Sequence, residues 1–384
     1  MNKSYDVIII GAGSVGNVTA LILAENKFKV AVIDRFSSAG QGQNKAAIGG
    51  IRATHIEPSK IYLGQESLSF FKNYNDKYGY SIGWYQGGYL YPIYQENHKE
   101  TLSKNVLIQQ EYGLNINWFS SDEIKELVHG INDENLLGGT WSPDDGSASP
   151  VMSAQSFYKE ALKLGVDYYF NEKVIDILKD SSKITGLKTD KNIFNAKWII
   201  NASGISATEI GNFTNTKIQL LPDSHEAGIT EPVAKFLNPM IVDIRKDEGS
   251  SNYYFYQNHE GQIEFCITPD PPISGIDNRA TSEFLPMVAK RMVNLLPKLA
   301  SLRVRRTWRG IYPNTKDGSP IIAIDKNYEG MIHAVGMCGQ GYMFGPGIGF
   351  LINRILLNKL NERDKFILER LSVDRDYSSN ELLR

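Results

Sequence analysis

The feature that most constrains the fold is the glycine motif GAGSVG at residues 11–16, which follows an apolar run and opens a helical pattern. The preceding run, Val7–Ile10, shows no polar alternation, as is typical of a parallel strand covered on both faces. A second apolar run ends at Asp34, so residues 5–34 predict a strand, turn, helix and strand. We therefore expect the first strand at the centre of a parallel sheet.

In this context each glycine of the motif has a physical role in binding a dinucleotide. The first permits a tight turn, the second lets the backbone approach a pyrophosphate, and the third lets helix and strand pack closely. The helix N-terminus offers unpaired N–H groups to an anion, and Asp34 can accept hydrogen bonds from a ribose. The predicted contacts are Gly11, Gly13, Ser14, Val15, Gly16, Asp34 and Arg35. The motif does not separate NAD from FAD, although the charge of Asp34 disfavours NADP.

Charge and composition restrict the partners. Lys and Arg number 41 against 43 Asp and Glu among 384 residues, so there is no basic excess to offset a nucleic acid backbone. The one local cluster, Arg303, Arg305 and Arg306, is interpreted as a solvated strand edge or an interface feature rather than an anion site. Cys266 and Cys338 match neither zinc nor disulfide spacing. No stretch reaches the ~18 apolar residues of a transmembrane segment, and we expect a cytoplasmic protein.

The pattern changes after the first βαβ unit, which predicts two interleaved domains of an α/β protein. Aromatic residues and turns over 84–91 and the alternation in 262–267 are typical of antiparallel strands. We expect a Rossmann-like nucleotide-binding domain over 1–85, 140–215 and 305–384. An α+β substrate domain built on an antiparallel sheet is expected over 86–139 and 216–304. A substrate would then lie in the cleft between them.

A second glycine-rich segment, Gly336–Gly349, follows a predicted strand and opens a predicted closing helix. N–H groups at the start of that helix would stabilise the negative charge that a flavin acquires at N1 and O2 on reduction. A nicotinamide becomes neutral on reduction and has no such need. The segment therefore favours FAD over NAD, the alternative interpretation being a flexible loop.

Together these segments resemble the D-amino acid oxidase-like FAD oxidoreductases, and within them the sarcosine oxidase beta subunit and proline dehydrogenase beta subunit group. The resemblance covers nearly the whole chain. It is carried by residues 11–16, 49–52, 201–204, 222 with 230–232, 308–322 and 336–349.

The resemblance implies the remaining cofactor contacts residue by residue. Those near the adenine and pyrophosphate are Val174, Ala202 and Gly204, and those beside the flavin ring are Gly49, Gly50, Gly310, Gly339, Gly341, Tyr342 and Met343. Gly310 stands where monomeric sarcosine oxidases have the cysteine that links the flavin, so a non-covalent FAD is expected. Arg52, Tyr254 and Tyr312 are the candidate catalytic residues, with Arg52 suited to a substrate carboxylate. His55 and Tyr256 are candidates for the pocket wall, although His55 is interpreted first as a structural histidine.

The activity implied is oxidation of the C–N bond of a small amino acid or secondary amine, of sarcosine, proline or glycine type, by hydride transfer to flavin N5. Tyr312 replaces the carboxylate-binding arginine of glycine oxidases, and Met343 replaces a lysine of monomeric sarcosine oxidases. Glu264 lies roughly where those oxidases place a lysine that assists oxygen, which favours another electron acceptor or a partner subunit. The alternatives are an FAD-dependent dehydrogenase of a hydroxy acid or glycerol phosphate, and a flavin electron-transfer subunit without its own substrate.

Overall fold

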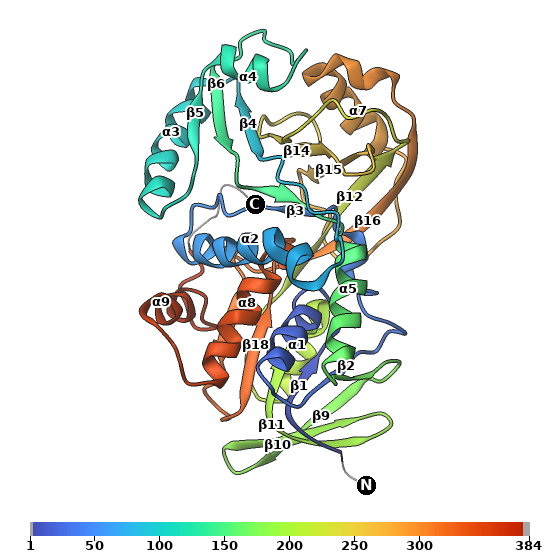
Figure 1. Cartoon of the computed structure of the whole chain (residues 1–384), viewed down its shortest axis with the longest axis vertical. Coiled ribbons are helices and arrows are strands. Elements are labelled where there is room, and N and C mark those ends of the chain that lie inside the picture. The colour runs from blue at the N-terminus through green and yellow to red at the C-terminus, as the bar shows by residue number, and fades with distance from the viewer. Residues whose placement is uncertain (1–2, 379–384) are drawn as a thin grey trace.

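The computed structural model describes residues 3–378 and contains two large sheets, one beyond the other along the long axis of the molecule (Figure 1). The first sheet has the strand order β17-β18-β11-β1-β2-β8, with β10 pairing β11 and β9 pairing β10. Its strands are β1 (Lys3–Ile10), β2 (Val30–Ile33), β8 (Asp167–Tyr169), β9 (Val174–Asp180), β10 (Lys183–Thr189), β11 (Ile193–Asn201), β17 (Ile321–Ile324) and β18 (Met331–Val335).

Strand β1 lies at the centre of this sheet, as the sequence predicts. It pairs in parallel with β2 on one side and β11 on the other, so that Val7 lies opposite both Val30 and Trp198. Val7, Ile8 and Ile9 have no exposed surface. The uninterrupted apolar run is thus explained by burial on both faces of the sheet.

Helices cover both faces of the first sheet, and α1 (Gly16–Glu25) is buried along most of its length. The other helices here are α2 (Pro58–Tyr78), α5 (Pro150–Lys163), α6 (Ala207–Asn212), α8 (Gly341–Leu356) and α9 (Glu362–Arg370). Helix α8 approaches α1 closely because Gly345 lies where a Cβ would come within 2.5 Å of the Ser14 carbonyl oxygen. This contact brings the second glycine-rich segment against the first.

The second sheet has the strand order β16-β12-β15-β14-β13-β4-β6-β5. Its strands are β4 (Tyr89–Ile93), β5 (Asn117–Phe119), β6 (Gly138–Ser142), β12 (Leu221–Thr230), β13 (Met240–Asp243), β14 (Ser250–Gln257), β15 (Ile263–Pro269) and β16 (Val304–Asn314), and α3 (Glu96–Glu111), α4 (Ser121–Leu127) and α7 (Phe284–Leu295) accompany it. Short elements complete the chain: β3 (Gly50–Ile51), β7 (Gly146–Ser147), η1 (Gln43–Ala46), η2 (Gly204–Ser206) and η3 (Pro297–Ser301).

The second sheet is built mainly of antiparallel pairs, as predicted, and departs from this pattern at one pair of strands. β4 runs parallel to β13, whereas its other neighbour, β6, is antiparallel. A parallel pair needs a crossover connection, and here the chain between β4 and β13 supplies it. The strand also begins at Tyr89, later than expected, because Tyr85 forms only an isolated bridge with Ser147. The domain boundaries given above stay a prediction.

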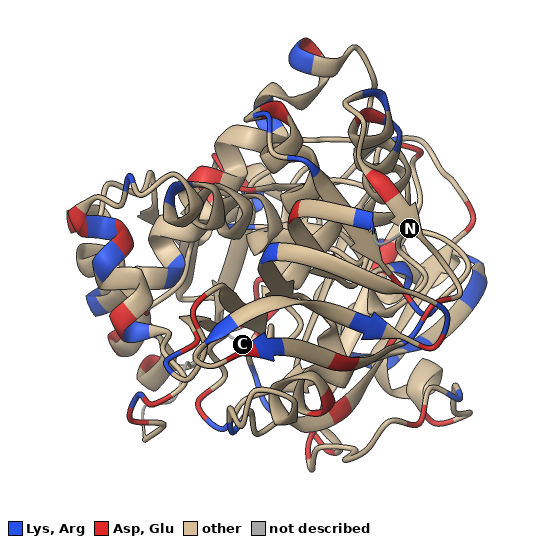
Figure 2. Cartoon of the chain, turned by 90° about the horizontal axis from the view of Figure 1, so that it is seen from below, with Lys and Arg blue, Asp and Glu red and all other residues tan. Residues whose placement is uncertain are grey.

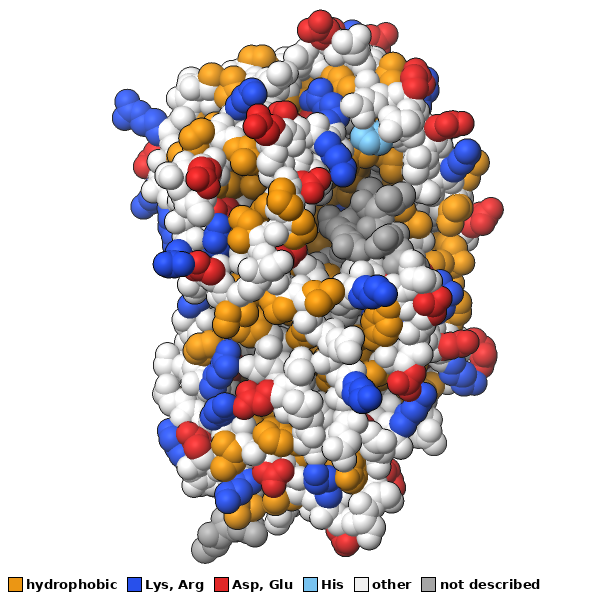
Figure 3. Space-filling view, turned by 180° about the vertical axis from the view of Figure 1, so that it is seen from behind, with side chains coloured by type: hydrophobic (Ala, Val, Ile, Leu, Met, Phe, Trp, Pro, Cys, Tyr) orange, Lys and Arg blue, Asp and Glu red, His pale blue; other side chains and the backbone are white. Residues whose placement is uncertain are grey.

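Charged residues of both signs are interspersed along the chain in Figure 2, and their side chains are interspersed over the face seen in Figure 3. Arg305 and Arg306 lie exposed on β16, the edge strand of the second sheet, in agreement with their interpretation as a solvated edge. Both cysteines are free and buried. Within residues 3–378, no helix has the length and apolarity to cross a membrane, and no acidic, His or Cys cluster could hold a metal ion.

Candidate functional site

One cavity of about 870 Å³ extends from the carboxyl ends of β1 and β2 to the second sheet. This volume lies at the upper end of the ~300–1,000 Å³ typical of ligand sites. Most of the site residues predicted from the sequence line it, namely Gly11, Gly13, Ser14, Val15, Asp34, Arg35, Gly50, Arg52, Val174, Ala202, Gly204, Tyr254, Gly310, Tyr312, Gly339, Gly341, Tyr342 and Met343. Gly16 and Gly49 are not among the lining residues.

The three glycines of the first motif differ in what surrounds them. A Cβ on Gly11 would lie 2.5 Å from the Ala202 carbonyl oxygen, and one on Gly16 would lie 1.9 Å from the carbonyl oxygen of Gly11. A Cβ on Gly13 would meet no atom within 4 Å. Gly11 and Gly16 therefore serve the packing of the turn, whereas Gly13 leaves open space on the cavity side for a ligand.

Asp34 stands at the end of β2 and faces the same part of the cavity. One carboxylate oxygen accepts from the backbone N–H of Ala12 (2.7 Å) and the other from that of Phe36 (2.8 Å). Burial raises the pKa of Asp34, and the two backbone donors oppose this. An ionised carboxylate has about four lone-pair sites, so each oxygen can still accept from a ribose hydroxyl.

Elsewhere on the cavity wall, the segment between β18 and α8 is held in an unusual backbone conformation. Cys338 has φ +50° and Gly339 has φ +78°, which aims the backbone that precedes α8 into the cavity. Gln340 is buried, yet neither its side-chain oxygen nor its nitrogen has a partner among residues 3–378. Unsatisfied buried amides are costly, so a ligand with donors and acceptors, such as a flavin pyrimidine, fits this end.

The loop that carries Arg52 is fixed by a buried carboxylate that sequence reasoning did not identify. Asp145 accepts from the N–H of Ala53 and from the hydroxyls of Thr54 and Ser142, each at 2.8 Å. Burial is the main reason that the pKa of Asp145 rises to about 6. Arg52 itself is 5% exposed, and its guanidinium donates to the Thr54 carbonyl oxygen. Arg52 is thus pre-positioned at the cavity wall.

Gly49, predicted as a flavin contact, is not among the residues that line the large cavity, and its surroundings require a glycine for packing. Its φ is +92°, and a Cβ there would lie 2.1 Å from the Ala148 carbonyl oxygen. The glycine is required because β3 turns here against the strand that contains Ser147. Its neighbours Ile48 and Gly50 line the large cavity, whereas Gly49 itself does not.

Two tyrosines from neighbouring regions of the second sheet form the wall near Arg52. The hydroxyls of Tyr254 and Tyr312 lie 3.1 Å apart, although β14 and β16 are not adjacent strands. Burial raises the pKa of both phenols, so they stay protonated and can donate hydrogen bonds. The ring of Tyr312 also lies where a Cβ on Gly339 would come within 2.3 Å of it. The wall and the second glycine segment are therefore in direct contact.

His225 and Asp223 line the cavity beside Tyr312, and sequence reasoning missed both. The imidazole stacks on the Tyr312 ring at a centroid distance of 3.9 Å, and its Nε2 lies 3.3 Å from an Asp223 carboxylate oxygen. His225 Nδ1 is buried without a hydrogen-bond partner in the described part of the chain. Their spacing of two residues on one strand, which places both side chains on one face, is the signal that could have found them.

The remaining candidates lie outside the large cavity. His55 is fully buried and packs on Phe344 with ring centroids 4.9 Å apart, and its burial lowers the pKa of the imidazole. This agrees with a structural histidine. Tyr256 donates to the Ile48 carbonyl oxygen and, with Glu264, lines a separate cavity of about 290 Å³. Burial raises the pKa of Glu264 to about 7.

Comparison with known proteins agrees with the resemblance read from the motifs. A family model described as FAD dependent oxidoreductase (DAO) matches residues 6–355. Sarcosine oxidase subunit beta of Arthrobacter sp is 25% identical over 366 residues, which cover 93% of this chain and 88% of that protein. Glycine oxidase of Geobacillus kaustophilus is 22% identical over 366 residues, with 94% of each chain covered.

Solved structures show the same fold. The crystal structure of L-proline dehydrogenase from P. horikoshii superposes with a TM-score of 0.89 at 26% identity, covering 97% of this chain and 98% of that one. That of glycine oxidase from Geobacillus kaustophilus gives a TM-score of 0.86 at 22% identity, covering 98% and 100%. The predicted α/β fold class is thereby confirmed.

Proposed function

This chain belongs to the FAD dependent oxidoreductase (DAO) family, and on that premise we propose that it oxidises the C–N bond of a small amino acid or secondary amine. The substrate class is that of sarcosine, proline or glycine. The proposal rests on one observation above all: Arg52, Tyr254 and Tyr312 face the same cavity as the dinucleotide motif. A wall that could bind a carboxylate and a cradle for the cofactor therefore share one cavity.

The cofactor is FAD, and the residues present fit its two ends. The start of α1 with Gly13 and Asp34 would hold the pyrophosphate and ribose, and Gln340 with the N-terminus of α8 would meet the flavin pyrimidine. When bound, FAD supplies the two-electron acceptor, which takes a hydride at N5. We propose that it binds non-covalently, because Gly310 offers no side chain to link it.

Arg52 would bind the substrate carboxylate, since a planar guanidinium matches a carboxylate with two parallel hydrogen bonds. The hydroxyls of Tyr254 and Tyr312, kept protonated by burial, would donate to the same carboxylate and orient the α-carbon. These three groups lie on one side of the cavity and so hold the substrate in one orientation. Positioning of this kind is the main contribution that the chain itself makes to the rate.

His225 would accept the proton that the substrate ammonium must lose before its C–H bond breaks. An imidazole nitrogen with a free lone pair can accept a proton from a substrate within hydrogen-bond reach. Asp223, 3.3 Å from Nε2, would fix the ring and stabilise its protonated form. The nitrogen without a partner, Nδ1, is then the one that receives the proton.

We further propose that electrons leave through a partner subunit or another acceptor rather than oxygen. One relative, sarcosine oxidase subunit beta of Arthrobacter sp, is by its name a subunit of an enzyme. In this chain Glu264 stands roughly where monomeric sarcosine oxidases place a lysine that assists oxygen, and it lines a separate small cavity rather than the large one. Mass measurement of the chain purified alone and with its genomic neighbours would test for the partner.

An anaerobic absorbance scan of the flavin-loaded protein tests the substrate class. L-Proline, sarcosine, glycine and D-amino acids would each be added, with glycerol 3-phosphate and a 2-hydroxy acid as contrasts. We expect one amino acid or amine to bleach the flavin band. Bleaching only by a hydroxy compound would overturn the amine proposal, and bleaching by none would favour an electron-transfer subunit. Recovery of the band in air, if slow, would support an acceptor other than oxygen.

A further inference from the structure

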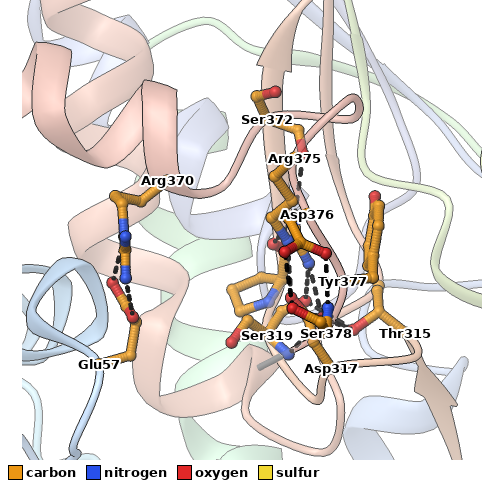
Figure 4. Close-up of polar contacts among 12 residues, drawn as sticks. Glu57, Thr315, Asp317, Ser319, Arg370, Ser372, Arg375, Asp376, Tyr377 and Ser378 are labelled. Atoms are coloured by element: carbon orange, nitrogen blue, oxygen red, sulfur yellow. Dashed lines mark hydrogen bonds and ion pairs between the residues drawn. The ribbon is translucent and has the colours of Figure 1, made fainter. Parts of the chain in front are cut away.

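The segment that follows α9 packs against the loop between β16 and β17, and Arg375 lies at the centre of the contact (Figure 4). Its guanidinium pairs with both carboxylate oxygens of Asp317, at 2.7 and 2.9 Å. It also donates to the carbonyl oxygens of Ser319 (2.7 Å), Pro320 (2.9 Å) and Ser372 (3.1 Å). A guanidinium has five N–H donors, and these contacts use them all.

This contact is buried, unlike the other ion pairs of the same segment. The side chains of Arg375 and Asp317 are 7% and 2% exposed, whereas those of Lys326 and Asp374, which also pair at 2.7 Å, are 76% and 64% exposed. Exposed pairs are screened by water and contribute little, whereas loss of one partner from a buried pair leaves an uncompensated charge. Arg375 is therefore the fixed point of the segment.

The contact continues from Asp317 to the wall of the cavity. The Thr315 hydroxyl, with one proton to donate, lies within hydrogen-bond distance of an Asp317 carboxylate oxygen (2.8 Å) and of the Ser319 carbonyl oxygen (2.7 Å), the two groups that Arg375 also binds. The backbone N–H of Thr315 donates to Cys338 Sγ at 3.3 Å, and the Thr315 hydroxyl lies 3.4 Å from the same sulfur. Cys338 lines the cavity and has φ +50°, a left-handed conformation that residues other than glycine adopt only when their surroundings hold them.

We propose that Arg375 is a positioning residue for the flavin: through Asp317 and Thr315 it holds Cys338 left-handed, and with it the backbone that opens α8. The N–H groups of this backbone would then face the flavin pyrimidine and would stabilise the negative charge that the flavin acquires on reduction. The effect is geometric, because Asp317 neutralises the charge of Arg375. The inference rests on FAD binding and not on the substrate class.

Three variants separate this role from a merely structural one. Thr315→Val keeps the side-chain shape but removes the hydroxyl that contacts Asp317, the Ser319 carbonyl oxygen and Cys338 Sγ. Arg375→Lys keeps the charge but loses the planar fork that makes five hydrogen bonds. Asp374→Asn removes an exposed pair on the same segment and is the matched control. Each would be measured for FAD dissociation constant, for midpoint potential by dithionite titration, and for melting temperature of the apoprotein.

We expect Thr315→Val and Arg375→Lys to weaken FAD binding about tenfold or more. We also expect both variants to show a smaller preference for reduced over oxidised flavin than the wild type shows. A tenfold loss of that preference lowers a two-electron potential by about 30 mV. Asp374→Asn should change neither quantity. A wild-type dissociation constant and potential in Thr315→Val would overturn the proposal, even if the apoprotein melts at a lower temperature. Because dithionite replaces the substrate, the outcome is independent of the proposed amine oxidation.

Discussion

Replacing Gly13 by valine should separate cofactor binding from folding. A Cβ at this position meets no protein atom within 4 Å, so the variant should fold, with an unfolding free energy of the apoprotein within about 1 kcal/mol of wild type. The added carbons would occupy the space on the cavity side that the pyrophosphate needs. Each charge-assisted hydrogen bond from the start of α1 contributes about 1.5–3 kcal/mol. Loss of two would weaken FAD binding by about 3–6 kcal/mol, or about 10²- to 10⁴-fold.

The assay is a fluorescence titration of apoprotein with FAD, accompanied by thermal melting of the same sample. Gly16→Ala is the contrasting variant, because its Cβ would lie 1.9 Å from the Gly11 carbonyl oxygen and should lower the stability of the apoprotein itself. If the Gly13→Val protein purified with a full complement of flavin, the assignment of this turn to the pyrophosphate would be refuted.

Four further predictions address the rest of the site. Arg52→Ala should weaken carboxylate-bearing substrates by about 2–5 kcal/mol, and unchanged substrate dependence of flavin reduction would leave Arg52 a structural role. Acid precipitation should release all flavin to the supernatant, and a yellow pellet would show a covalent link. His225→Gln should slow flavin reduction most at neutral pH and least near the pKa of the substrate amine, so a rate deficit equal at every pH would argue against proton transfer to His225. Burial raises the pKa of Asp145 from 3.8 to about 6. The protonated carboxyl therefore contributes about 3 kcal/mol to the stability of the fold below pH ~4, and this contribution is lost as the pH rises through about 6. Denaturant melts of the apoprotein across this range should show that pH dependence in wild type and not in Asp145→Asn.

The part of the site formed by one contiguous motif was predictable from the sequence itself. Gly11, Gly13 and Asp34 act within one βαβ unit, where the order of strand, turn and helix fixes their positions. The resemblance to a known family added the residues that are distant in sequence, such as Tyr254 and Tyr312, whose hydroxyls lie 3.1 Å apart. No local pattern could have placed those two side chains together, because β14 and β16 are separated by two other strands.

The residues that were missed lie together only through long-range strand pairing. Asp223 and His225 reach Tyr312 because β12 pairs with β16 in a register that sets Asp223 opposite Tyr312. Asp145 reaches the Arg52 loop from a turn more than ninety residues away in sequence, as its contact with Ala53 shows. Gly49 stays a prediction as a flavin contact, since glycines that line a ligand and glycines that pack on backbone look alike in a sequence.

The contact between Gly339 and the Tyr312 ring couples two properties that enzyme engineers usually treat separately. Position 312 belongs to the wall that would select the substrate, and position 339 belongs to the backbone that would set the flavin potential. A change of side chain at 312 in pursuit of a new substrate would thus also shift the electron affinity of the cofactor. In variants at position 312, substrate selectivity and flavin reduction potential are therefore expected to change together. A second substitution near Cys338 is where the potential could be restored without changing the substrate wall.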